Sequence, residues 1–99
     1  MTSRSVAVVN QLGMHARAAA KFVHLAARFE SRIRVAREDR VMDGKSIMGI
    51  LLLAAARGST ITISADGIDE GDAVDALAAL VREGFGEDQA TPAVVQGAR

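Results

Sequence analysis

Two stretches of the chain alternate between polar and apolar residues. They read R-I-R-V-A-R at residues 32–37 and T-I-T-I-S at residues 60–64. Because successive side chains of a β-strand point to opposite faces, this alternation predicts two strands that bury one face and leave the other in water. A tight link at residues 38–39 joins the first of them to Val41 and Met42, which predicts a hairpin. A sheet with one buried face requires helices on that face only.

The rest of the chain predicts one more strand and three helices. Apolar residues at intervals of three and four favour helices, whereas short apolar runs that end in turn residues favour strands. Ser46 is the predicted N-cap of the second helix, and Gly58 its predicted C-terminal stop. Acidic residues at 69, 70 and 72 suit the start of the last helix, where the helix dipole is positive. The expected elements are a strand at 5–9 and helices at 16–29, at 47–56 and from about residue 69 to Gly84.

This order of elements, β-α-β-β-α-β-α, predicts the fold class. It is typical of an α+β open-faced β-sandwich, in which a four-stranded, mostly antiparallel sheet has three helices on one face. We assign residues 1–88 to this single domain. From Glu87 onward the residues are small or polar without sustained periodicity, so residues 89–99 are predicted to be a flexible C-terminal tail.

Composition excludes several classes of protein. The chain has no cysteine, so it can form neither a disulfide framework nor a thiolate metal site, and we expect a cytoplasmic protein. Its apolar runs are too short for a signal peptide or a membrane span. Twelve basic residues balance twelve acidic ones and the aromatic residues are three phenylalanines, which disfavours nucleic-acid binding. Basic residues are concentrated in the first forty positions, so an acidic partner would prefer that half. We expect a monomer without a cofactor.

His15 is the candidate reactive residue. It follows Gly13 and stands immediately before the first predicted helix, whose free backbone N–H groups and positive dipole end form a site for an anion. The same field favours a neutral imidazole, which can act as a nucleophile. A phosphoryl group on His15 would meet the amides of Ala16 and Arg17, and the Arg17 side chain could add charge-assisted donors. The alternative is that His15 merely caps the helix.

Two motifs in this order resemble the HPr family, the histidine phosphocarriers of the bacterial phosphotransferase system. They are GMHARAAAKFV at residues 13–23 and MDGKSIMGILLLAA at residues 42–55. The resemblance extends from residue 3 to about residue 87 and is strongest to the nitrogen-related branch, NPr, because Ala18 stands where most sugar-pathway members have proline. It implies that enzyme I phosphorylates Nδ1 of His15 and that a IIA protein then receives the group. Arg17 would steady the phosphoryl group, and Ser46 matches the serine that HPr kinase/phosphorylase modifies.

Two surfaces are candidates for binding these partners. The second helix is apolar almost all round, so one sheet cannot cover it, and Ile47, Met48 and Leu51 form a predicted docking group. The first helix carries basic side chains on the face opposite its apolar stripe. The predicted contact residues on the first helix are Ala16, Lys21, His24 and Arg28, together with Arg17.

Other interpretations remain for two features. The basic stripe is equally typical of a solvated helix face, with contact to acidic partners as the second possibility. The acidic residues from Asp66 to Asp72 are explained by a turn and a helix start, so we expect no metal site. For the whole chain, the alternative to a phosphoryl carrier is a small regulatory or corepressor domain that binds partners and transfers nothing. A carrier of this kind is not an enzyme, because it turns over nothing alone.

Overall fold

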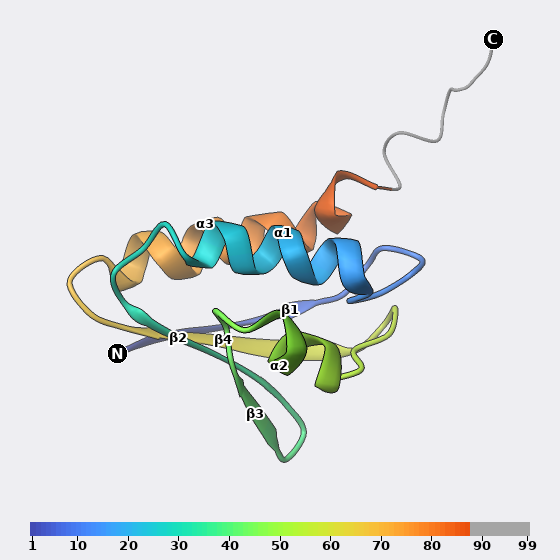
Figure 1. The fold of residues 1–99 in the computed structure, drawn as a ribbon, viewed down its shortest axis with the longest axis horizontal. Helices are drawn as coiled ribbons and strands as arrows, with labels where there is room; N and C mark the ends of the chain where they lie inside the picture. Colours follow the sequence, from blue (N-terminus) through green and yellow to red (C-terminus); the bar gives the residue numbers. More distant parts are fainter. Residues whose placement is uncertain (88–99) are drawn as a thin grey trace, which may run out of the picture.

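The four strands of residues 1–87 form one antiparallel sheet in the order β1-β4-β2-β3 (Figure 1). The computed structural model describes residues 1–87, so the predicted tail at 89–99 lies outside the described part of the chain. The elements are β1 (Thr2–Ala7), α1 (Ala16–Ala26), β2 (Arg32–Arg37), β3 (Arg40–Asp43), α2 (Ile47–Leu52), β4 (Thr60–Asp66), α3 (Glu70–Arg82) and the short 3-10 helix η1 (Gly84–Gly86).

The sheet buries one face, as the alternating sequence predicts. In β4, Ile61, Ile63 and Ala65 are fully buried, whereas the intervening Thr62 and Ser64 lie on the opposite, open face. On that open face Ser64 shares a 2.9 Å hydrogen bond between side-chain hydroxyls with Ser3 of β1. Hydroxyl pairs therefore cover the wet side of the sheet while branched apolar residues form its core side.

The helices complete the core on the buried face. α1 and α3 lie side by side along the sheet, and α2 lies beside β3 and α1 (Figure 1). Phe22 of α1, Ile50 of α2 and Leu77 of α3 are all inaccessible to solvent and belong to one apolar cluster with the inward residues of the strands. This arrangement confirms the predicted open-faced α+β sandwich.

The bounds of several elements differ from the predicted ones. β1 begins at Thr2 and ends at Ala7, rather than spanning 5–9, because pairing with β4 extends over the polar first residues. α1 ends at Ala26 instead of residue 29, since the amides of Arg28 and Phe29 bond three residues back in a tighter turn. β4 continues to Asp66, where it pairs with the first residue of β2.

α2 is the shortest α-helix within residues 1–87 and ends earlier than its sequence suggests. It stops at Leu52 rather than at residue 56, because Ala54 adopts a left-handed conformation with φ +52° just beyond the helix. That conformation is a common way to end a helix, although glycine usually provides it. Gly58, the predicted stop, instead has φ +91° in the turn that leads into β4. Ser46 caps the helix as predicted: its hydroxyl accepts a 3.1 Å hydrogen bond from the amide of Gly49.

Candidate functional site

The loop before α1 is fixed by Gly13. This residue has φ +67°, and a Cβ at its position would lie 2.6 Å from the carbonyl oxygen of Ala55, so only glycine fits. The next residue, Met14, is buried and donates its amide to the same carbonyl at 2.9 Å. The loop is thus anchored to the segment after α2, and His15 emerges at a defined position at the start of α1.

His15 stands immediately before α1, as predicted, and it is the N-cap residue of this helix. Its backbone is extended, with φ −75° and ψ −179°, and its carbonyl accepts the amide of Ala19 at 2.8 Å. The ring nitrogen Nδ1 accepts the amide of Arg17 at 3.3 Å. The side chain is 28% exposed, so it is held by the fold yet reachable by another molecule. Nδ1 therefore faces the free amides of a helix N-terminus, which is the environment that stabilises an anion.

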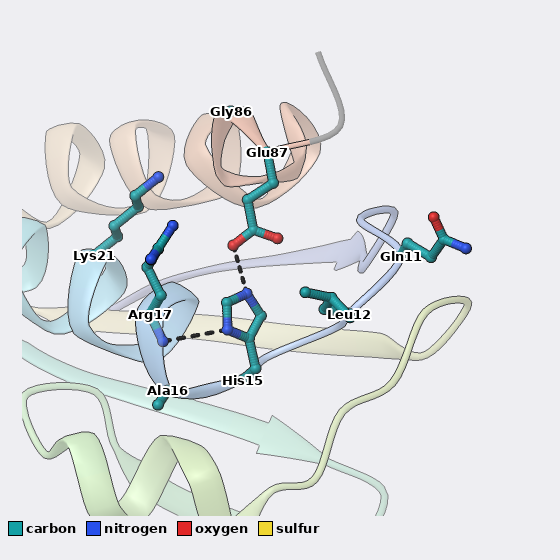
Figure 2. Close-up of a pocket in the computed structure, with 8 residues that line it drawn as sticks. All are labelled: Gln11, Leu12, His15, Ala16, Arg17, Lys21, Gly86 and Glu87. Carbon is teal, nitrogen blue, oxygen red and sulfur yellow. Dashed lines mark hydrogen bonds and ion pairs between the residues drawn. The ribbon is translucent and has the colours of Figure 1, made fainter. Parts of the chain in front are cut away.

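The other ring nitrogen contacts a residue far along the chain. Nε2 of His15 lies 2.5 Å from Oε2 of Glu87 (Figure 2). Glu87 is itself held by Asn10, whose side-chain amide donates to Oε1 at 3.0 Å. Partial burial raises the pKa of Glu87, but the hydrogen bonds from Asn10 and His15 and the nearby charges of His15 and Lys21 outweigh it, so the pKa of Glu87 lies below its ordinary value. The carboxylate is ionised at neutral pH.

The segment that carries Glu87 folds back over the start of α1. Gly84 has φ +67°, the buried Phe85 has φ +57° and Gly86 has φ +76°, so three successive left-handed residues turn the chain after α3. Lys21 fixes this turn, because its ammonium group donates a 2.8 Å hydrogen bond to the carbonyl oxygen of Phe85. The turn thus brings Glu87 next to His15, although the two residues are 72 positions apart in the sequence.

An open pocket of about 870 Å³ surrounds these groups. Figure 2 shows the side chains of Arg17 and Lys21 extending from α1 beside the His15 ring, with Leu12 on the other side. Within residues 1–87 the guanidinium of Arg17 has no ion-pair partner, so its donors can reach a bound anion. The pocket combines a nucleophilic nitrogen, two cations and the positive end of a helix, a set that suits a phosphoryl group.

The other predicted residues divide between this pocket and a separate surface. Ala16 and Lys21 line the pocket, whereas His24 and Arg28 are exposed farther along α1 and at its end. The predicted docking group is exposed on α2, with Ile47 40%, Met48 66% and Leu51 36% accessible. Ser46, partly buried at the N-terminus of α2, and the docking group do not line the pocket.

Three residues of the site escaped prediction from sequence. Glu87 and Asn10 read as a polar residue after the last helix and as a turn residue, and neither position carries a local signal for contact with His15. Leu12, 70% exposed on the rim of the pocket, would have been found by asking which apolar residues precede the histidine in a loop. The contacts of Glu87 with His15 and Asn10 form only when the fold brings the segment after α3 next to the loop before α1.

Residues 1–87 contain neither a metal-binding cluster nor a membrane-spanning helix. Between residues 1 and 87, histidine and carboxylate side chains form no group of three or more that could hold a metal ion. In the same range, every helix is too short or too polar to cross a membrane.

Comparison with known proteins supports the same interpretation. Residues 2–83 match the family model PTS-HPr, described as the PTS HPr component phosphorylation site. The chain is 48% identical to phosphocarrier protein HPr of Cupriavidus necator, covering 90% of this chain and all of that protein. It is 39% identical to phosphocarrier protein NPr of Shewanella violacea, covering 85% of this chain and 92% of that one. The branch within the family stays a prediction.

Solved structures agree with the sequence matches. The crystal structure of HPr from Thermoanaerobacter tengcongensis superimposes with a TM-score of 0.85 at 40% identity, covering 88% of this chain and 98% of that one. Family model, sequence relatives and fold therefore coincide over most of the chain. The chain belongs to the HPr family of phosphocarrier proteins of the phosphotransferase system.

Proposed function

We propose that this chain accepts a phosphoryl group from phosphorylated enzyme I on Nδ1 of His15 and passes it to a IIA protein. The observation that supports this most directly is the placement of Nδ1 against the N-terminus of α1, with its lone pair directed toward the amide of Arg17. The lone pair forms the new N–P bond as the bond between phosphorus and the donor breaks. The chain is then a relay substrate, because each turnover needs a donor and an acceptor protein.

The transferred group gains stabilisation from groups that are already in place. Its negative oxygens meet the unpaired amides and the positive dipole of α1, so little reorganisation is needed. The Arg17 guanidinium adds charge-assisted hydrogen bonds. Enzyme I and the IIA protein would dock on α2 through Ile47, Met48 and Leu51, whose exposed apolar surface lies near the basic side chains of α1.

We further propose regulation through Ser46 by a kinase of the HPr kinase/phosphorylase type. Ser46 is partly buried and starts α2, next to the docking group. A phosphate there adds about 1.5 to 2 negative charges to the surface that a partner must approach. It would therefore act on docking rather than on the chemistry at His15.

Phosphorylation of the purified protein tests the relay. Incubation with phosphoenolpyruvate and a matching enzyme I should add one acid-labile phosphate, measured by intact mass before and after acid treatment. His15→Ala should abolish this addition, whereas His24→Ala, which removes the other histidine from an exposed part of α1, should still take up one phosphate at completion, whatever its rate. A chain that remains unmodified under conditions that charge a known HPr would be a regulatory domain instead.

A further inference from the structure

We propose that Glu87, oriented by Asn10, is a positioning residue that fixes the tautomer of His15, with the proton on Nε2 and Nδ1 free to attack. The inference rests on the proposed function, because it assigns the group that prepares the nucleophile. Glu87 lies outside the matched family segment of residues 2–83 and comes to the site only through the turn after α3.

Both ring nitrogens of His15 indicate the same tautomer. The amide of Arg17 is a donor, so the Nδ1 atom that receives it at 3.3 Å must be unprotonated. The carboxylate of Glu87 is an acceptor, so the Nε2 atom 2.5 Å away must carry the proton. A neutral imidazole satisfies both contacts in one tautomer only. In the other tautomer a ring N–H would face a backbone N–H, and a lone pair would face a carboxylate.

Asn10 makes this orientation specific. It is fully buried, and its side-chain amide donates both to Oε1 of Glu87 at 3.0 Å and to the carbonyl of Gly13 at 2.8 Å. One oxygen of the carboxylate is thus occupied by Asn10, and the other is turned toward His15. His15 is thus oriented by the carboxylate of Glu87, which is in turn held by the amide of Asn10. Buried carboxylates orient catalytic histidines in the same way in other proteins.

The carboxylate also has a role once the group has been transferred. When Nδ1 forms the N–P bond with its lone pair and the proton stays on Nε2, the imidazole ring acquires a positive charge. The carboxylate of Glu87 faces that charge in a partly buried position, so the attraction between the carboxylate and the ring grows as the N–P bond forms. No proton has to leave the ring during the forward step or return during the reverse step.

Glu87→Gln tests this role with little change of shape. A glutamine side chain offers one oxygen and one NH₂ group to two donors, Asn10 and Nε2–H, so one of the two contacts must be lost. ¹⁵N-histidine NMR at a pH where His15 is neutral should show mainly the Nε2–H tautomer in the parent protein and a mixture in the variant. The rate of phosphorylation by enzyme I should fall about 10- to 100-fold, by analogy with the loss caused by removing the partners that orient metal-ligating histidines.

Glu83→Gln is the matched control, because this substitution removes the same charge from an exposed residue at the end of α3. It should change neither the tautomer nor the rate. Glu87→Asp keeps the carboxylate and should retain more of the Nε2–H tautomer than Glu87→Gln. An unchanged tautomer in Glu87→Gln overturns the proposal, whether or not the rate falls, since a slower reaction would then reflect partner contact. The tautomer is measured without a phosphoryl donor, so failure of the relay itself would appear separately, as a parent protein that takes no phosphate.

Discussion

At position 17 the backbone and the side chain have different tasks. The amide of Arg17 directs the lone pair of His15, and any residue except proline can supply it, whereas the guanidinium stands exposed in the pocket with no ion-pair partner among residues 1–87. Arg17→Gln should therefore keep the fold and the His15 tautomer. It should slow phosphoryl transfer about tenfold, because a charge-assisted hydrogen bond contributes about 1.5 to 3 kcal/mol and solvent exposure places this one at the lower end.

Stopped-flow or quench-flow rates in both directions, with enzyme I and with the IIA protein, provide the measurement. Arg34→Gln is the control, since Arg34 is an exposed arginine of β2 far from the pocket. Equal rates for Arg17→Gln and the parent protein in both directions would remove the guanidinium from the site.

Single residues show where prediction from sequence succeeds and where it stops. His15 and Arg17 were predicted because a helix start can be recognised locally, from a glycine turn followed by apolar residues at helical spacing. Glu87 is 72 positions from His15, and its contact depends on left-handed backbone at Phe85 and Gly86. No short-range pattern encodes that contact.

Among the elements, α2 combines a predicted start with an unpredicted end. The start at Ser46 follows from side-chain chemistry, because a hydroxyl can receive a free helix amide. The end follows from the left-handed Ala54, a conformation that alanine adopts only when the surrounding packing requires it. Apart from β1, the strands and the long helices were predicted more closely, since their periodic apolar faces match the buried positions.

Ser46→Asp should separate the stability of α2 from its proposed role in docking. Aspartate is as good an N-cap as serine and its charge suits the helix start, so the thermal midpoint should stay within a few degrees of that of the parent protein. The new charge lies next to Ile47 and Met48, where an acidic partner must approach. Because like charges at an interface cost several kcal/mol, the rate at which enzyme I phosphorylates His15 should fall about tenfold or more.

Ser46→Ala should have the opposite effects to Ser46→Asp, with lower stability and an unchanged rate. It removes the cap and should lower stability by about 1 kcal/mol, or roughly 4 to 8 °C in a small domain, while the rate of phosphorylation stays close to that of the parent protein. Calorimetry and the transfer assay on the same preparations check both values. A normal rate in Ser46→Asp would place α2 outside the surface that enzyme I contacts.

For the molecule as a whole, the start of α3 ties together segments that are distant in sequence. Asp69 accepts hydrogen bonds from the Ser31 hydroxyl at 2.5 Å, the Glu30 amide at 2.8 Å and the Ser31 amide at 3.0 Å, and these bonds hold the pKa of Asp69 below its ordinary value. Glu70 accepts the Thr2 hydroxyl at 2.6 Å and lies 3.1 Å from the α-amino group of Met1. One helix end thus binds both the loop before β2 and the beginning of β1.

These contacts make the stability of the domain depend on pH in a defined window. The Thr2 hydroxyl, the Gly67 amide and the α-amino group lower the pKa of Glu70 from 4.5 to about 2. A carboxyl group whose pKa is lower in the folded protein contributes stability that is complete above its unfolded pKa and is lost as the pH falls through its folded pKa. The contribution of Glu70 should therefore be full at pH 7 and disappear between about pH 4.5 and pH 2.

Glu70→Gln should show this dependence in thermal midpoints measured from pH 7 to pH 2. At pH 7 the variant should unfold at a lower temperature than the parent protein, because the uncharged side chain loses the attraction of the α-amino group and weakens the hydrogen bonds from Thr2 and Gly67. The two midpoints should converge toward pH 2, where the parent side chain is also protonated in a growing fraction of molecules. Glu83→Gln, which removes a carboxylate at the other end of α3, controls for the general effect of net charge. A difference for Glu70→Gln that persists undiminished at pH 2 would mean that side-chain shape, rather than the ionised carboxylate, joins α3 to the start of β1.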